Sequence, residues 1–429
     1  MSTNPRQIFA GLVAFLFITT TAGAQTTDIT APVDISLVPE LISPSDTGLG
    51  GLPHYKYGIF ASMGGSTNPQ LYEFDTGGPG FYAVYSTNPA YASNAKAWGT
   101  NFTPVNSTNG TASYTSGNDY YGASVSTAVT IYSATNSTPD FATTITSATN
   151  VIVGQTTSIT NADSSKAANT GWPTNGPAVE SYFYGDFGLA LASASNGIMN
   201  VIAQLNYASN VIPGFIVSLG TQPTNTNSAP NASIQIGLTT NDLANFPIKV
   251  YLNGQNTNIL FSNTGVPTYS EAALLSSLTL SSTNGSGNFS MPVVIDSGAT
   301  PAMHYTNTAT NLTQFFNNGV SGGGVMSNTE LTLNVTNTSN QTVDLYNVGI
   351  GDTSPDVGVT TTQTNVFGGG LYDFNIGEQL YYKYNVAYDL KDGIIAFQPI
   401  SVPEPGTWCL FGVCGILLLG LLVLRRRSL

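Results

Sequence analysis

The chain has 429 residues, of which 41% are hydrophobic and only 8% charged, and its formal net charge at pH 7 is −13. No arginine lies between Arg6 and Arg425, so the sequence lacks the basic patch that nucleic-acid binding requires. Both cysteines, Cys409 and Cys414, lie in a C-terminal apolar run, and the two histidines form no cluster. These features exclude a cysteine nucleophile and a His-rich zinc site in the rest of the chain.

Residues 1–24 have the pattern of a secretory signal peptide. Arg6 precedes an apolar core at 8–18, and small residues at 22–24 end the segment. We therefore expect the protein to be exported. Residues 25–53 are rich in Pro, Ser, Thr and Gly, and we expect them to form a flexible lead-in.

The body of the chain favours strands over helices. Short runs rich in Val, Ile, Thr, Tyr and Phe alternate with Gly, Pro, Asn and Ser, which is typical of a mostly β fold. Only Ser195–Ser209 carries apolar residues at helical spacing, and Ser270–Leu278 could form a second short helix.

Two tripeptides place an Asp and a Gly turn directly after an apolar, strand-like run, and they are 221 residues apart: Asp75-Thr76-Gly77 and Asp296-Ser297-Gly298. A third match, at 46–48, has no strand-like run before it, and we interpret it as a chance match. Because no His or Cys system is available, carboxylate chemistry remains. Two carboxyls held about 3 Å apart cannot both ionise and would share one proton.

Residues 54–400 resemble the pepsin-like aspartic proteases, because matching segments occur in the same order along the chain. These are a hairpin before the first Asp at 57–74, an apolar strand at 81–84, a flap-like hairpin at 113–117, and further segments at 185–190, 212–220, 366–368 and 386–397. The resemblance implies a bilobal, mostly β, pepsin-like fold with an N-terminal lobe at 54–220 and a C-terminal lobe at 221–400.

The resemblance also implies roles for individual residues. Asp75 and Asp296 would be the catalytic dyad, activating a water that attacks the peptide bond. Four residues would support the catalytic loops: Thr76, Gly77, Ser297 and Gly298. Tyr114 and Gly117 would belong to the flap that covers the substrate. We accordingly expect a monomeric endopeptidase that acts on polypeptides and needs no cofactor or metal.

Three departures from the family pattern leave an alternative open. Gly78 and Ala299 stand where the family commonly has a Ser or Thr beside each Asp. Asp186-Phe187 replaces an apolar pair, which would place a charge beneath the first catalytic loop, and the basic prosegment is missing. The alternative is a catalytically weak or inactive pepsin-like protein with a structural or adhesive role at the cell surface or in the extracellular matrix.

The C-terminal residues 401–429 have the pattern of a second targeting signal. The residues Pro403, Glu404 and Pro405 precede an apolar run at 408–424, which is long enough for a transmembrane helix, and three arginines follow. This arrangement resembles the PEP-CTERM sorting signal of Gram-negative bacteria. It implies a transient inner-membrane anchor, processing by an exosortase-type enzyme, and a final place at the cell surface or outside the cell; an ordinary tail anchor is the alternative.

Overall fold

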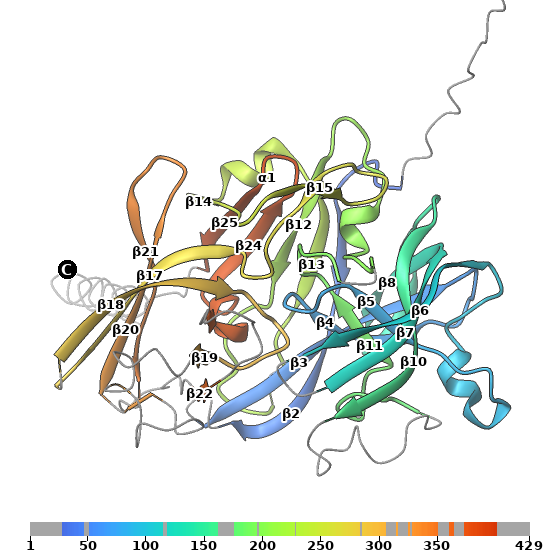
Figure 1. Ribbon diagram of the computed structural model, residues 1–429, viewed down its shortest axis with the longest axis horizontal. Helices are drawn as coiled ribbons and strands as arrows, with labels where there is room; N and C mark the ends of the chain where they lie inside the picture. The colour runs from blue at the N-terminus through green and yellow to red at the C-terminus, as the bar shows by residue number, and fades with distance from the viewer. Residues whose placement is uncertain are drawn as a thin grey trace, which may run out of the picture.

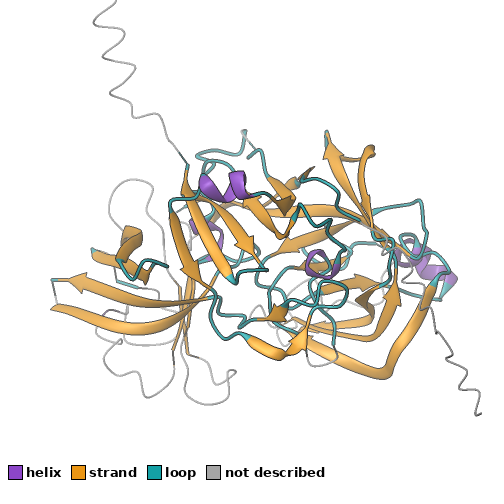
Figure 2. Cartoon of the chain, turned by 90° about the horizontal axis from the view of Figure 1, so that it is seen from above, coloured by secondary structure: helices purple, strands orange, loops and turns teal. Residues whose placement is uncertain are grey.

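The computed structural model describes residues 28–46, 51–114, 118–161, 176–194, 197–227, 229–283, 285–305, 315, 325–326, 328–350, 360–363 and 373–400. Strands dominate these residues, and the helices are short (Figure 2). The described helices are the α-helix α1 (Thr240–Ala244) and the 3₁₀ helices η2 (Pro89–Ala95), η4 (Ile202–Gln204) and η7 (Gly377–Leu380). The predicted mostly β class is confirmed.

A ten-stranded sheet forms the first lobe and carries the first Asp turn (Figure 1). Its strand order is β6-β7-β10-β5-β11-β4-β3-β8-β9, with β2 paired to β3. The strands are β2 (Val38–Asp46), β3 (Leu52–Met63), β4 (Gln70–Asp75), β5 (Phe81–Val84), β6 (Phe102–Ser113), β7 (Asn118–Thr127), β8 (Val129–Thr135), β9 (Thr138–Thr146), β10 (Val151–Asn161) and β11 (Gly185–Gly188).

A seven-stranded sheet forms the second lobe, on the opposite side of the molecule in Figure 1. Its order is β21-β20-β17-β18-β23-β19-β22. The strands are β17 (Leu274–Ser282), β18 (Gly285–Val294), β19 (Ala302–Tyr305), β20 (Thr329–Thr336), β21 (Thr342–Ile350), β22 (Thr360–Gln363) and β23 (Asp373–Asn375). Burial alternates along β17 and β20, so each strand turns one face to the core.

A six-stranded sheet joins the two lobes, because it takes strands from both. Its members, in sheet order, are β1 (Val33–Ser36), β13 (Ser233–Leu238), β12 (Ile212–Ser218), β24 (Tyr384–Asp389), β25 (Ile394–Pro399) and β14 (Ile248–Tyr251). Phe215 of β12 stacks on Tyr388 of β24 with ring centroids 4.6 Å apart. A small hairpin completes the described strands: β15 (Asn256–Leu260) and β16 (Pro267–Thr268).

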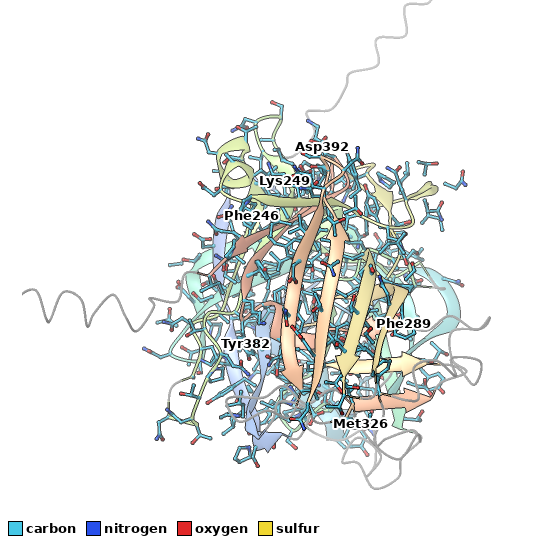
Figure 3. The ribbon with its side chains drawn as sticks, turned by 90° about the vertical axis from the view of Figure 1, so that its left-hand side faces the viewer. Phe246, Lys249, Phe289, Met326, Tyr382 and Asp392 are labelled. Atoms are coloured by element: carbon cyan, nitrogen blue, oxygen red, sulfur yellow. The ribbon has the colours of Figure 1, made fainter. Side chains whose placement is uncertain are left out.

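A second contact between the lobes joins two buried tyrosines. Tyr382, which follows η7, lies against the blue strands of the first lobe in Figure 3, and its hydroxyl is 3.0 Å from that of Tyr57 in β3. Burial raises the pKa of both hydroxyls, so both remain neutral. The lobes are therefore joined by ordered side chains as well as by the shared sheet.

Some local expectations are wrong. The lead-in predicted to be flexible forms β1 and β2 over much of its length, because Ile35 and Val38 are buried against β13 and β3. Asp46, interpreted as having no strand before it, ends β2. The second short helix is absent over 270–278, where β17 begins with strand-like alternation of burial.

The predicted helix at 195–209 is also wrong, because only η4 is helical among its described residues. The side chain of Asn200 accepts hydrogen bonds from the backbone N–H groups of Ile202 and Ala203, and such local bonding competes with helix formation. The apolar residues at helical spacing are nonetheless buried: Ile198, Val201, Ile202 and Leu205.

Several predictions lie outside the described residues. These are the signal peptide at 1–24, the flap residue Gly117, the segment 366–368 and the sorting signal at 401–429 with its helix. Within the described part of the chain, no helix is long and apolar enough to cross a membrane.

Candidate active site

Both Asp turns lie on equivalent three-stranded units, one in each lobe. In the first lobe, β11 lies between β4 and β5, parallel to β4 and antiparallel to β5. In the second, β23 lies between β18 and β19, parallel to β18 and antiparallel to β19. Asp75 ends β4, and Asp296 follows β18 by two residues. The fold thus presents the two Asp residues from matching positions.

Each turn orients its own carboxylate and lies close to the carboxylate of the other lobe. The N–H of Gly77 donates to Asp75 Oδ1 at 2.7 Å, and the N–H of Gly298 donates to Asp296 Oδ1 at 2.7 Å. A Cβ added to Gly77 would lie 2.6 Å from Asp296 Cγ, and one added to Gly298 would lie 2.9 Å from Asp75 Cγ. Glycine is required at both positions because any side chain would collide with the facing carboxyl group.

Reciprocal hydrogen bonds between Thr76 and Ser297 join the two turns. The N–H of Thr76 donates to Ser297 Oγ at 3.1 Å, and the N–H of Ser297 donates to Thr76 Oγ1 at 2.8 Å. Each hydroxyl in turn donates to a backbone carbonyl of the opposite lobe, Ile295 for Thr76 and Phe74 for Ser297. The hydroxyl of Tyr381 adds a further bond to Thr76 Oγ1 at 2.9 Å. Thr76 and Ser297 therefore hold the two turns together across the boundary between the lobes.

The electrostatics of the pair favour a shared proton. Burial raises the pKa of Asp75 well above its usual value, and the charge of Asp296 and a hydrogen bond between the two carboxyls raise it further. Asp186 and Glu73 add to the same effect. A pair of this kind binds one proton where two separate carboxylates would bind none.

A lysine and a glutamate lie beside the dyad. Lys56 Nζ is 2.7 Å from Glu73 Oε1 and 3.6 Å from Glu180 Oε1. Burial alone would lower the pKa of Lys56, but Glu73 and Glu180 raise it on balance, so the lysine stays charged. Burial also raises the pKa of Glu73, against the opposing effect of Lys56. The two side chains form a buried ion pair.

Asp186 adds a further acid to the site. It is 1% exposed and pairs with Glu73 in the parallel register of β11 and β4. Burial raises the pKa of Asp186 well above its usual value, Glu73 and Asp296 raise it further, and a hydrogen bond from Tyr114 together with Lys56 opposes the shift. Asp186, expected to place a charge beneath the loop of Asp75, is therefore a buried acid that contributes to the site.

Tyr114 connects the β6–β7 hairpin to this acid. The residue follows the end of β6, and its N–H donates to the carbonyl of Asn118 across the hairpin at 2.9 Å. Its hydroxyl donates to Asp186 Oδ2, and its ring packs on Tyr120 at 4.9 Å between centroids. Burial, then the charge of Asp186, raise the pKa of Tyr114 well above its usual value, so the hydroxyl remains a donor.

Asn375 is a site residue that sequence reasoning missed. Its Nδ2 donates to Asp296 Oδ2 at 2.7 Å, and its Oδ1 accepts from the N–H of Gly377 at 2.9 Å. Asn375 pairs with the residue two positions before Asp296, just as Asp186 pairs with the residue two positions before Asp75. A signal existed, because each of these residues is followed by an apolar residue and a Gly.

Gly78 and Ala299, which replace the Ser or Thr expected beside each Asp, have different surroundings. A Cβ at Gly78 would lie 2.4 Å from Asp186 Oδ2 and 3.0 Å from Asp75 Oδ2, so the carboxyl of Asp186 occupies the space of a side chain at 78. Ala299 lines the same cavity as the dyad. The hydrogen bond from Asn375 to Asp296 supplies on this side a donor that Ala299 lacks.

One small cavity brings these groups together. It measures about 70 Å³, and its lining residues are Lys56, Glu73, Asp75, Tyr114, Asn118, Tyr120, Asp186, Asp296, Gly298 and Ala299. Four of them are acids and one is a base. Across the described ranges, no group of three or more His, Cys, Asp and Glu side chains is arranged to hold a metal ion.

Comparisons with known proteins recognise the tail of the chain. Residues 401–427 match the family model of the PEP-CTERM protein-sorting motif. The predicted sorting motif is confirmed, and it implies export, recognition by an exosortase-type processing enzyme, and targeting to the cell surface or the extracellular space.

The other two comparisons concern the whole chain. No curated protein matches it. Solved structures do, among them the crystal structure of aspartic proteinase from Irpex lacteus, at 13% sequence identity and a TM-score of 0.49. That match covers 87% of this chain and 99% of the other.

Proposed function

We propose that residues 54–400 form a pepsin-like aspartic endopeptidase whose catalytic dyad is Asp75 and Asp296. One observation carries the proposal: two buried carboxyls are presented by equivalent turns of the two lobes and face each other, since a Cβ at Gly77 would lie 2.6 Å from Asp296 Cγ and one at Gly298 would lie 2.9 Å from Asp75 Cγ. The reciprocal bonds of Thr76 and Ser297 support it, because they fix the distance between the turns. Preorganised groups of this kind need no rearrangement when charge develops in the transition state.

The proposed reaction is the hydrolysis of a peptide bond by an activated water. The ionised carboxylate of the dyad accepts a proton from the water, whose oxygen attacks the scissile carbonyl carbon. The protonated carboxyl stabilises the developing oxyanion by a hydrogen bond. A proton is then transferred to the leaving nitrogen, the C–N bond breaks, and the dyad again holds one proton. Tyr114 covers the site from the β6–β7 hairpin and limits access of bulk water.

The second candidate is a structural or adhesive protein with weak or no catalysis. The observation that favours it is the crowding of Glu73 and Asp186 beside the dyad, which raises the pKa of Asp75 beyond the effect of Asp296. A dyad that binds its proton too tightly is a poor general base at neutral pH.

Substitution of the dyad tests the endopeptidase. The purified body of the chain is incubated with denatured protein from acidic to neutral pH, with and without pepstatin. We expect pepstatin-sensitive cleavage that Asp75→Asn and Asp296→Asn each abolish while circular dichroism stays unchanged. Cleavage retained in both variants would show that another group is the catalyst, and no cleavage by the unaltered protein at any pH would favour the structural protein.

We further propose that the terminal helix at 408–424 holds the protein in the inner membrane until processing near Pro403–Pro405. The sorting motif matched at 401–427 supports this proposal. Mass spectrometry of the extracellular protein should then find no peptide from 410–424. An intact helix in the mature protein would favour a permanent anchor.

A further inference from the structure

The carboxyl group of Asp186 lines the cavity of the dyad and has one acceptor that is not used. Its Oδ2 accepts the hydroxyl of Tyr114, but its Oδ1 is buried without a hydrogen-bond partner among the residues that the structure describes. Buried polar atoms are nearly always satisfied, so a carboxyl group that lines a cavity with one acceptor unused is a natural contact for a ligand.

Acidic side chains outnumber basic ones around the cavity. Glu73 and Lys56 neutralise each other as an ion pair 2.7 Å apart. The other acids that line the cavity are Asp75, Asp186 and Asp296, and the described part of its lining contains no second base. Among the described residues, the side chain that hydrogen-bonds to Asp186 is the neutral hydroxyl of Tyr114. A buried carboxylate of this kind is costly until a cation approaches it. The chain as a whole carries a net charge of −13, which attracts cationic ligands.

Asp186 is close enough to the dyad to contact the residue next to the scissile bond. A Cβ built on Gly78 would lie 2.4 Å from Asp186 Oδ2 and 3.0 Å from Asp75 Oδ2, so both carboxyl groups border the same point. The β11–β4 register pairs Asp186 with Glu73, two residues before Asp75, so the three side chains leave the same face of the sheet. Asn375, at the equivalent place in the second lobe, is neutral.

We propose that Asp186 determines substrate specificity by accepting the ammonium or guanidinium group of a Lys or Arg side chain on one side of the scissile bond. The proposal rests on the proposed endopeptidase function and names its substrate class. Asn375, at the equivalent position of the second lobe, is neutral and does not attract a cation. The preference for Lys or Arg therefore applies only to the substrate residue on the first-lobe side of the scissile bond. Charge-assisted hydrogen bonds to a buried carboxylate are stronger than neutral ones, so the selectivity is substantial.

The preference depends on pH, because only the ionised carboxylate attracts a cation. Burial raises the pKa of Asp186, and the groups that face it are acids on β4 and after β18, a base on β3 and hydroxyls on the β6–β7 hairpin: Glu73, Asp75, Asp296, Lys56, Tyr114 and Tyr120. Selectivity for the cationic substrate therefore increases as pH rises.

Two peptides that differ in one side chain test the proposal. One carries lysine next to the scissile bond and the other norleucine, which has a similar length and no charge. We expect kcat/KM for the lysine peptide to exceed that for norleucine by about 10- to 100-fold near neutral pH, with a smaller ratio in acid. Asp186→Asn should reduce the ratio to about one, whatever its overall activity. Asp34→Asn, which removes one charge from an exposed position on β1, should leave the ratio unchanged.

A binding measurement separates this proposal from the catalytic one. The same two peptides are titrated into the Asp75→Asn variant, and into the unaltered protein at a temperature where no turnover occurs. Tighter binding of the lysine peptide that Asp186→Asn removes supports the specificity role even if the protein cleaves nothing. Equal binding and equal cleavage of both peptides would overturn it while leaving the endopeptidase proposal intact.

Discussion

Thr76 and Ser297 each donate a backbone N–H to the hydroxyl of the other, across the boundary between the lobes. Each residue therefore acts both as a donor and as an acceptor for a loop that lies 221 positions away. The geometry of the dyad depends on this reciprocity, because neither turn is held by its own lobe alone.

Removing one hydroxyl should damage both turns. Thr76→Val keeps the shape of the side chain but leaves the N–H of Ser297 without its acceptor and the carbonyl of Ile295 without its side-chain donor. Each unsatisfied buried group costs about 1–3 kcal/mol, so we expect a loss of about 3 kcal/mol in the free energy of unfolding. Denaturant titration measures it. Thr76→Ser restores the hydroxyl and should recover most of the loss; equal stability of the Val and Ser variants would contradict the role of the hydrogen bonds.

Asn375 should be required for full activity. Asn375→Ala removes the donor at 2.7 Å from Asp296 Oδ2, and a hydrogen bond to a charged group contributes about 1.5–3 kcal/mol. We expect kcat/KM to fall by about 10- to 100-fold, measured with one peptide substrate across a pH series. Asn347→Ala, at an exposed position of β21, is the control and should have little effect. A fall of the same size in both variants would point to a general loss of stability.

Gly78 should not tolerate a side chain while Asp186 is present. The added Cβ of Gly78→Ala would lie 2.4 Å from Asp186 Oδ2, and overpacking of this kind costs about 1–3 kcal/mol. Thermal unfolding measures the loss. Gly349→Ala is the matched control, because a Cβ there has no neighbour within 4 Å. In the double variant with Asp186→Ala, the penalty of the alanine at 78 should largely disappear; strictly additive losses would contradict the predicted collision.

Stability should be greatest in acid and should fall as pH rises. Asp75, Asp186 and Glu73 all have raised pKa values in the folded protein, from ordinary values of 3.8, 3.8 and 4.5. A raised pKa means that the folded state holds more protons than the unfolded state between the two values. Stability is therefore fully present below the unfolded pKa and is lost as pH rises through the folded one, by about 1.4 kcal/mol per pKa unit.

Thermal unfolding between about pH 4 and pH 7 measures this fall. Asp186→Asn should make the slope shallower, because one of the groups with a raised pKa is gone. Asp34→Asn should leave the slope unchanged. A melting temperature that rises with pH over this range would show that the buried acids are not protonated in the folded protein.

The sequence located the Asp turns because their signal is local: an apolar strand, an Asp and a Gly lie within a few residues of each other. Asn375 has a local signal as well, the apolar residue and the Gly that follow it, but that signal does not identify its partner. Asp296 is 79 residues away, and only the register of β18 and β23 brings the two together. The segment around Asn200 was predicted wrongly for a related reason. Helical spacing indicates which residues are buried, but the side chain of Asn200 determines the backbone that buries them.

The six-stranded sheet that joins the lobes can be completed only late in the synthesis of the chain. Strands β24 and β25 lie between β12 and β14 in this sheet, and β25 ends at Pro399. The sheet therefore cannot close until almost the whole body of the chain has been made. The matched sorting motif starts at 401, directly after the last strand. Any chain long enough to carry this motif therefore also contains every strand of the sheet, so sorting selects chains that can close the contact between the lobes.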